Sequence, residues 1–478
     1  MQQRSGGMHA LVWAGMFAQE REMASPERGS GQVRSSLQPA AVLFATPLLA
    51  EYVADPALNL EKDLLGVIID ERPFLGLFHS GIGRPAWPVG VLLRALVLQR
   101  QNAWHDRTLV AEMQDNTRVR YLLGLPLGTR AAPCRTAIGD FRRALVAAGL
   151  ETELFEQQVR WIGRHTTLID PQKDDFGLDA TRFEAAAAQP TIIGLLQHGL
   201  RRVVLAVRAV APEQITPLSE RFGLQEWLRQ RFQRCSRGLN SRAAKRLWAR
   251  CYRKAEKVLR ALKSLSGHAI LDEAVAILER IMAERGPDGT GKPADRLTNA
   301  LDTDARFGCK GADRHKITWH GGKISVIAHL PTDLIVGCDA MPANAVDGSA
   351  MARLVDQAKT LLQGQRTRLV HADSAYTDEA HRRQMTGREI QLIGPRRGKV
   401  RRGRVRGGGR VASKKDRGKR AHIERVQANM VRWRGNRRAW YLGRAKGLYQ
   451  AALSAFAANF VRLKTLALAG KVQLPVRT

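Results

Sequence analysis

Apolar residues that recur every three or four positions predict a helical region between residues 46 and 166. The clearest helix is Val89–Gln101, which follows Pro88, a residue that suits a helix start. Three more short helices are expected: Arg107–Gln114 capped by Asp106, a helix from Asn116 to about Gly124, and Ala137–Ala148. Short helices joined by short turns are typical of an all-α domain of the helix-turn-helix kind.

Alternating and β-prone segments predict a sheet in residues 167–468. The expected strands are Phe176–Phe183, Lys316–Leu330, Leu334–Met341, Thr367–Asp373 and Glu389–Ile393. A helix from about Gly348 to Leu362, with Asp347 as its cap, and a short helix after Thr377 separate the later strands. Residues 190–300 interrupt the strands with a mostly helical, Arg-rich pattern. The order predicts an α/β domain with a mixed sheet and a helical insertion.

Polar or irregular segments lie at the ends of the chain and in one internal tract. Residues 1–45 have no sustained period and are expected to be disordered, and 469–478 form a tail. Residues 395–420 are rich in Gly, Arg and Lys, with Asp416 as the one acid, and predict a flexible basic loop. Helical periodicity resumes at His422 and continues, with a break near Gly435, to Leu468. Glu424 therefore stands at the head of a helix.

Charge indicates the partner. The chain has 77 Lys and Arg against 44 Asp and Glu, a formal charge of +33, and most of the positive residues are Arg. Such an excess repels itself unless a polyanion neutralises it, and Arg suits forked phosphate contacts. Nucleic acid is the expected partner, ahead of a ribosomal site or an anionic membrane.

Other features argue against export and membranes. The five cysteines form no Cys-x-x-Cys pair, so neither a disulfide framework nor a zinc ribbon is predicted. The apolar stretch Ala10–Phe17 lacks a convincing signal-peptide pattern. The longer stretch Ala451–Ala469 is interrupted by Asn459, Arg462 and Lys464 at helical spacing, which favours a helix packed on a core.

Carboxylates at strand ends are candidates for metal-assisted phosphodiester chemistry. Two divalent ions held by carboxylates can activate the attacking oxygen and stabilise the leaving one. Asp179 and Asp373 each fit a strand position, and Glu424 fits the helix. Alternatives for the first position are Asp170, Asp174 and Asp175, which lie in a polar loop.

Three other groups have both a functional and a structural interpretation. The Asp302, Asp304 pair could bind metal, although turn capping is the commoner role of this pattern. Histidines 315, 320 and 329 do not have the spacing of a common zinc site. Lys316 and Trp319 could touch DNA or occupy a hairpin face.

Five segments, in order, resemble the insertion-sequence transposases that carry a DDE catalytic domain of RNase H-like fold. They are Gly83–Pro85 with Pro88–Arg94, Asp106-Arg107 and Tyr121–Pro126; Leu178–Ala185; Asp302–Gly308 with Pro342–Asp347; His371–Tyr376; and Ile423–Val426 with Arg432–Gly435. The resemblance implies an RNase H-like mixed sheet preceded by an N-terminal DNA-binding domain. It also implies that Asp179, Asp373 and Glu424 are the catalytic residues and hold two Mg²⁺ or Mn²⁺ ions.

The implied reaction is hydrolysis at the element's ends to free a 3′-hydroxyl, followed by attack of that hydroxyl on target DNA. Double-stranded DNA would be the partner, a homodimer or larger assembly would form on it, no membrane would be involved, and the location would be the bacterial cytoplasm. Rival interpretations are an RNase H-like nuclease without strand transfer and a decayed transposase that only binds DNA.

Arginines supply the candidate DNA contacts. Arg135, Arg142 and Arg143 lie on or near the predicted recognition helix, where a solvated face is an equal alternative. Arg420 precedes Glu424 by four residues, as in related transposases. Some relatives place a Lys seven residues after the Glu, where this chain has Val431. The neighbouring Arg432 is a candidate for that phosphate contact.

Overall fold

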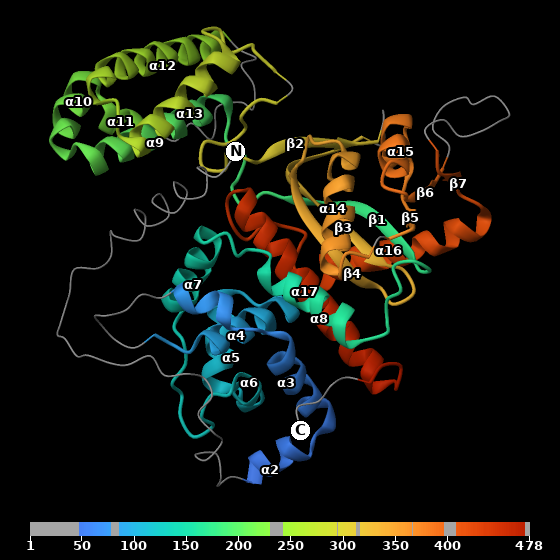
Figure 1. Ribbon diagram of the computed structural model, residues 1–478. Helices are drawn as coiled ribbons and strands as arrows, with labels where there is room; N and C mark the ends of the chain where they lie inside the picture. Colours follow the sequence, from blue (N-terminus) through green and yellow to red (C-terminus); the bar gives the residue numbers. More distant parts are fainter. Residues whose placement is uncertain are drawn as a thin grey trace.

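A computed structural model describes residues 47–77, 86–229, 242–293, 295–311, 316–365, 367–395 and 408–473 (Figure 1). The predicted disorder of residues 1–45, the Gly83-Arg84-Pro85 segment and residues 396–407 of the basic loop fall outside these ranges. Within them, a helical N-terminal region packs beside a mixed sheet, and a separate helical bundle projects from the sheet (Figure 1). The structure is therefore mixed α/β, as predicted.

The described residues of the N-terminal region form helices joined by short turns and coil, with no strand among them. Asn116 caps α6 by accepting a hydrogen bond from the Val119 amide, and Gly124 ends it with a left-handed φ of 72°. Asp106 does not cap α5 as predicted but is its first residue. The elements are α2 (Pro47–Ala54), α3 (Pro56–Ile68), η3 (Arg72–Leu77), α4 (Val89–Gln101), α5 (Asp106–Asp115), α6 (Thr117–Leu123), α7 (Arg135–Ala147) and α8 (Glu153–His165).

The sheet combines antiparallel and parallel pairs in the order β2-β3-β1-β5-β6-β7, with β4 also paired to β3. β1 is central, antiparallel to β3 and parallel to β5. The strands are β1 (Asp175–Glu184), β2 (Arg306–Lys310), β3 (Ile317–His329), β4 (Leu334–Pro342), β5 (Leu369–His371), β6 (Gln391–Gly394) and β7 (Arg410–Val411). Five were predicted, whereas β2 and β7 were not, because both are short and contain or follow Gly.

The helical insertion has its own hydrophobic core, which includes Leu196, Trp248 and Leu278. Its elements lie together in the green to yellow bundle of Figure 1. They are α9 (Ile192–Val210), η4 (Pro212–Gln214), α10 (Ile215–Phe222), α11 (Leu224–Arg229), α12 (Arg242–Ala261), η6 (Lys263–Leu265) and α13 (Ala269–Arg285). The amphipathic pattern of this segment therefore buries its apolar faces within the bundle itself.

The second half of the chain supplies the helices that pack on the sheet. They are η8 (Asp347–Ala350), α14 (Met351–Leu361), η9 (Ser374–Tyr376), α15 (Glu379–Thr386), α16 (Lys414–Trp433) and α17 (Arg444–Leu468). Asp378 caps α15. Asp347 was expected to cap the helix after β4, but its carboxylate instead accepts a hydrogen bond from the Lys323 ammonium at 2.6 Å.

The basic loop is shorter than predicted, because α16 begins at Lys414 and not at His422. Ser413 and Asp416 form a capping box, in which each side chain bonds the other residue's backbone amide. The Asp416 carboxylate also pairs with Arg410 at 2.5 Å, and this hydrogen bond lowers its pKa. Asp416 therefore fixes the helix start, and Glu424 lies in the middle of α16 and not at its head.

Helix α17 joins the N-terminal helices to the sheet. It contacts β4 on one side and α3, α4, α7 and α8 on the other, and one hydrophobic core runs through all these elements. By length and composition α17 could span a membrane, but 67% of its apolar window is buried within the protein. It is the core helix that the sequence predicted.

Candidate active site at the ends of strands β1 and β5

Two aspartates lie side by side where the central parallel strands meet. The parallel register of β1 and β5 sets Gly177 opposite His371. Asp179 lies two residues further along β1, and Asp373 lies two residues after His371, just beyond the end of β5. The charge of Asp373 acts on Asp179, so the two acids are near each other. Neighbouring strands are about 4.8 Å apart, which brings two such carboxylates within reach of a common ion. The structure thus joins two acids that are far apart in sequence.

Burial and the second carboxylate raise the pKa of Asp179 to about 6. Burial is the larger cause, and the charge of Asp373 adds to it. A hydrogen bond from the Ala180 amide, 2.8 Å long, and the charges of Lys310 and Arg420 act in the opposite direction. Crowded carboxylates in a half-buried position are poorly stabilised without a cation, which is typical of a functional site.

We expect the metal-free protein to lose about 2–3 kcal/mol of stability through Asp179 as pH rises from about 4 to about 6. In that window the unfolded chain has released the Asp179 proton while the folded chain still binds it. Each rise in pH therefore favours unfolding, until Asp179 ionises in the folded state as well. The measurement is urea unfolding of the wild type and the Asp179→Asn variant at several pH values, with a chelator present.

The difference in unfolding free energy between the wild type and Asp179→Asn reports the contribution of the Asp179 carboxyl. Asp179→Asn should be the more stable protein at pH 7 and should lose its relative advantage near pH 4. Asp356→Asn, on the surface of α14, is the control and should show no such trend. An Asp179→Asn variant that is less stable than the wild type at pH 7 would show that the charged carboxylate is well stabilised by the fold.

Helix α16 packs across β1 at the level of Asp179. The Gln427 side-chain amide donates a hydrogen bond to the Asp179 carbonyl oxygen at 3.0 Å. Glu424 lies one turn earlier, so its backbone is held near the aspartate pair. Its carboxylate is 61% exposed and pairs with Arg420 at 3.2 Å. Arg420 thus lies beside Glu424 and close enough to Asp179 to affect its pKa.

The two aspartates suit a hard divalent cation, whereas the third candidate acid, Glu424, is paired with an arginine. Asp179 and Asp373 offer carboxylate oxygens, which Mg²⁺ and Mn²⁺ prefer. In the described part of the chain, however, no group of three His, Cys, Asp or Glu side chains is close enough to hold one ion. The aspartate pair is assembled, whereas the Glu424 carboxylate is turned to Arg420.

The other acids considered for the first position have structural surroundings. The His329 ring lies 3.0 Å from the Asp174 carboxylate. His371 lies 2.8 Å from Asp175, which links the starts of β1 and β5. Asp170 lies in an exposed turn. These partners explain the acids without metal chemistry, and they favour Asp179 among the four.

The histidines and the aromatic residue of the β3 hairpin also have local partners. His320 lies 2.8 Å from the Thr298 hydroxyl, and burial lowers its pKa. His315 lies outside the described residues. The Trp319 side chain is buried, which supports packing and not DNA contact, whereas Lys316 is exposed.

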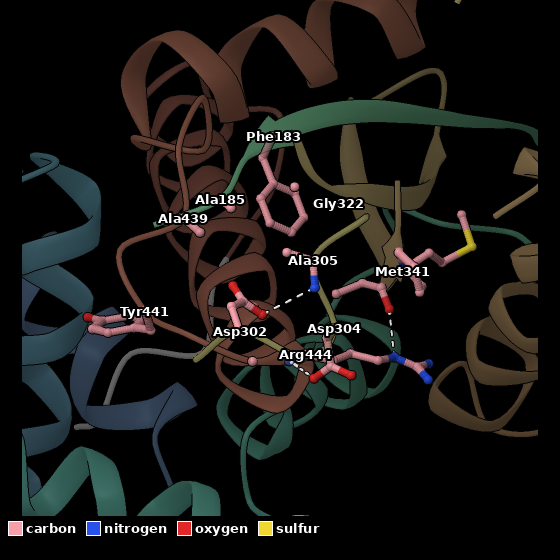
Figure 2. Close-up of a pocket in the computed structure, with 15 residues that line it drawn as sticks. Phe183, Ala185, Asp302, Asp304, Ala305, Gly322, Met341, Ala439, Tyr441 and Arg444 are labelled. Atoms are coloured by element: carbon pink, nitrogen blue, oxygen red, sulfur yellow. Dashed lines mark hydrogen bonds between the residues drawn. The ribbon is translucent and has the colours of Figure 1, made fainter. Parts of the chain in front are cut away.

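Asp302 and Asp304 line a separate small cavity of about 30 Å³ beside Phe183 (Figure 2). The Asp302 carboxylate accepts a hydrogen bond from the Ala305 amide at 3.2 Å, and the Asp304 carboxylate accepts one from the Arg444 amide at 2.7 Å. Both acids therefore cap a loop and the start of α17. Burial raises the pKa of Asp302. Asp373 does not line this cavity, so the cavity is separate from the candidate active site.

Arg142, a predicted DNA contact, is a buried structural residue. Its guanidinium hydrogen-bonds the Asp106 carboxylate at 2.8 Å and the Gln99 side chain at 3.4 Å, and it lies over the Tyr441 ring. Only 8% of its side chain is exposed. These contacts tie α7 to α4, α5 and the segment before α17, which contradicts a role for Arg142 at the DNA surface.

The remaining predicted DNA contacts are accessible to different degrees. Arg135 is exposed at the start of α7, and Arg432 is exposed in the last turn of α16. Arg143 is half-buried and pairs with Asp140 in the same helix. Arg135 and Arg432 therefore have the exposure that a phosphate contact requires.

Lys310, near the aspartate pair, was not identified from sequence. It ends the unpredicted strand β2 and lies close enough to lower the pKa of Asp179. Tyr376, which belongs to the segment that resembles the second catalytic Asp and its aromatic follower, is fully buried. Burial together with the charges of Asp179 and Asp373 raises the pKa of its hydroxyl.

Two family models match the chain in succession. Residues 58–144 match a transposase domain (DUF772), and residues 288–459 match a transposase DDE domain. The second match includes Asp373 and Glu424, whereas Asp179 lies before it and the helical insertion separates the two. There is no match to a curated protein or to a solved structure. The chain therefore belongs to the insertion-sequence transposases that carry a DDE domain.

Proposed function

We propose that this transposase cleaves DNA at the ends of its element and joins the freed 3′-hydroxyl to target DNA, using divalent metal at Asp179 and Asp373. The observation that carries the proposal is the electrostatic coupling of the two acids, since the charge of Asp373 acts on Asp179, together with the parallel pairing of β1 and β5 just before them. The raised pKa of Asp179 supports it, because a bound cation would relieve the repulsion between the two acids. The N-terminal helices would bind the element's end sequences.

The roles of the residues follow from their positions. Asp179 and Asp373 would ligate metal, which supplies an activated oxygen nucleophile and stabilises charge on the leaving oxygen. The chain's own contribution is to hold the scissile phosphate against the carboxylate pair. The charges of Arg420 and Lys310 lower the pKa of Asp179, so both cations lie near it. Their side chains are suited to binding phosphate oxygens.

Glu424 would complete the site after releasing Arg420. The two side chains form an exposed pair four residues apart on α16, and such pairs contribute only about 0.3–0.5 kcal/mol. Binding of a DNA phosphate by Arg420 would free the Glu424 carboxylate toward the metal. The cost of this rearrangement is small compared with the energy of a metal–carboxylate contact.

Glu424→Gln is expected to reduce cleavage by about 100-fold, or about 2.7 kcal/mol, because the amide is a poor ligand for a hard cation. The measurement is single-turnover cleavage of a labelled element end with Mg²⁺. Glu379→Gln is the matched control, since Glu379 is an exposed glutamate paired with Arg383 four residues away. Equal activity of the two variants would remove Glu424 from the proposed site.

The proposal as a whole is tested with labelled element ends, plasmid target and Mg²⁺. The ends to be tested are inverted repeats sought in the DNA on either side of the reading frame. Cleaved ends together with joined product support a transposase. Cleaved ends without joined product favour an RNase H-like nuclease, and binding without either product identifies a chain that has lost its activity. The gel mobility of the protein–DNA complex, measured at a defined ratio of protein to DNA, tests whether the protein binds as a dimer.

A further inference from the structure

One helix of the insertion carries a continuous basic face. Helix α12 holds eight Arg or Lys residues and one acid, Glu256. Its exposed residues other than Ala243 are all basic, and they are Arg242, Lys245, Arg246, Arg250, Arg253, Lys257 and Arg260. The spacing from Arg246 through Arg250, Arg253 and Lys257 to Arg260 is four, three, four and three residues, which keeps these side chains on one helix face.

The opposite face of α12 is fixed in the insertion's core. Trp248, Cys251, Ala255 and Val258 are all at most 1% exposed. The Trp248 indole also donates a hydrogen bond to the Gly286 carbonyl oxygen at 3.1 Å, just after α13. The basic face is therefore held outward by the packing of the bundle, and Figure 1 draws α12 on the side of the insertion away from the sheet.

Carboxylates of the protein do little to neutralise this face. Among the described residues, the one ion pair made by its basic side chains joins Arg260 to Glu256 at 3.8 Å. The neighbouring α13 differs, because it carries Asp272, Glu273, Glu279 and Glu284 against two arginines. The positive charge is thus concentrated on one helix and is not a uniform property of the insertion.

The shape of the face favours a nucleic-acid duplex over a membrane. A basic amphipathic helix binds a lipid surface by inserting its apolar side. The apolar side of α12 is already buried in the protein, so it is not available for insertion. From Arg246 to Arg260 the face extends about 21 Å along the helix, and B-DNA carries a phosphate charge about every 1.7 Å of its axis.

We propose that the outer face of α12 is a second DNA-binding surface, which grips the phosphate backbone of duplex DNA independently of base sequence. α12 lies between the two family matches, so neither matched domain accounts for it. The face contacts DNA away from the Asp179 and Asp373 pair and adds affinity without taking part in cleavage. The inference rests on the proposed function only in that the chain binds DNA.

The test is binding of the full-length protein to a labelled DNA duplex across a range of salt concentrations, without divalent metal. The variant removes four positive charges from the face: Arg246→Gln, Arg250→Gln, Arg253→Gln and Lys257→Gln. The control removes four exposed charges elsewhere: Arg164→Gln, Arg208→Gln, Lys359→Gln and Lys471→Gln. Thermal melting of both variants checks that the fold is retained.

The α12 variant should reduce the slope of log affinity against log salt by about 2–4, since each lost phosphate contact removes about 0.9. The control should change the slope by less than about 1. An unchanged slope in the α12 variant, or an equal change in the control, overturns the proposed surface. Absence of DNA binding by the wild type would instead refute the proposed function, and the two failures are therefore distinguishable.

Discussion

Replacing Asp179 or Asp373 with Asn is expected to reduce cleavage of element ends by about 10³-fold or more, equivalent to about 4 kcal/mol of transition-state stabilisation. Asn keeps the shape of the side chain but removes a charged metal ligand. The two carboxylates act as a pair across β1 and β5, so we expect the double variant to be little worse than either single one. Single-turnover cleavage at saturating protein measures the loss directly.

A DNA-binding measurement and a control variant at another aspartate distinguish a loss of chemistry from a loss of structure. Both variants should bind the uncleaved DNA as tightly as the wild type in the absence of metal. Asp302→Asn is the control, because Asp302 is a buried aspartate with a raised pKa that caps a loop beside a different cavity. The proposal would be contradicted if Asp302→Asn lost cleavage at a normal melting temperature while Asp179→Asn kept full activity. That result would place the chemistry at the cavity lined by Asp302.

Replacing Asn459 with Leu is expected to destabilise the protein by about 4 kcal/mol, a large fraction of the stability of a typical domain. Asn459 is fully buried on α17 and makes two hydrogen bonds with the backbone of Ile335 in β4, each 2.7 Å long. Leu would leave the Ile335 amide and carbonyl buried without these partners. Urea unfolding gives the change in free energy.

A substitution on the exposed side of the same helix provides the comparison. Thr465→Ala should change stability by less than about 0.5 kcal/mol, since Thr465 is exposed and bonds only its own helix. If Asn459→Leu were as mild as Thr465→Ala, the edge of β4 would have another source of hydrogen bonds. Folding of the N-terminal helices should be lost together with the sheet, because α17 packs on both.

The parts of the fold that could be predicted from sequence are those with strong local periodicity. β1, β3 and β4 alternate or consist of β-prone residues, and α4 has a clear helical period. Strand β2 was missed because it is short and contains Gly308, against which Trp319 packs closely. A tertiary contact, and not propensity, makes this segment a strand.

The candidate site shows a similar division. Strand positions pointed to Asp179 and Asp373, but only the pairing of β1 with β5 in the folded chain brings them near each other. The partners of Arg142 come from α4 and α5, and a local pattern on α7 carries no information about them. By contrast, the capping box of Ser413 and Asp416 has a sequence signature that could have corrected the start of α16.

The position of α17 has a consequence for the order in which the protein can fold during synthesis. The ribosome releases the N-terminal helices long before α17, yet the buried surfaces of α3, α4 and α8 are completed by that helix. The charged pair of Lys464 with the buried Glu61 of α3 likewise closes only when α17 arrives. The growing chain therefore exposes apolar surface until α17 emerges, and during that interval this surface is open to aggregation.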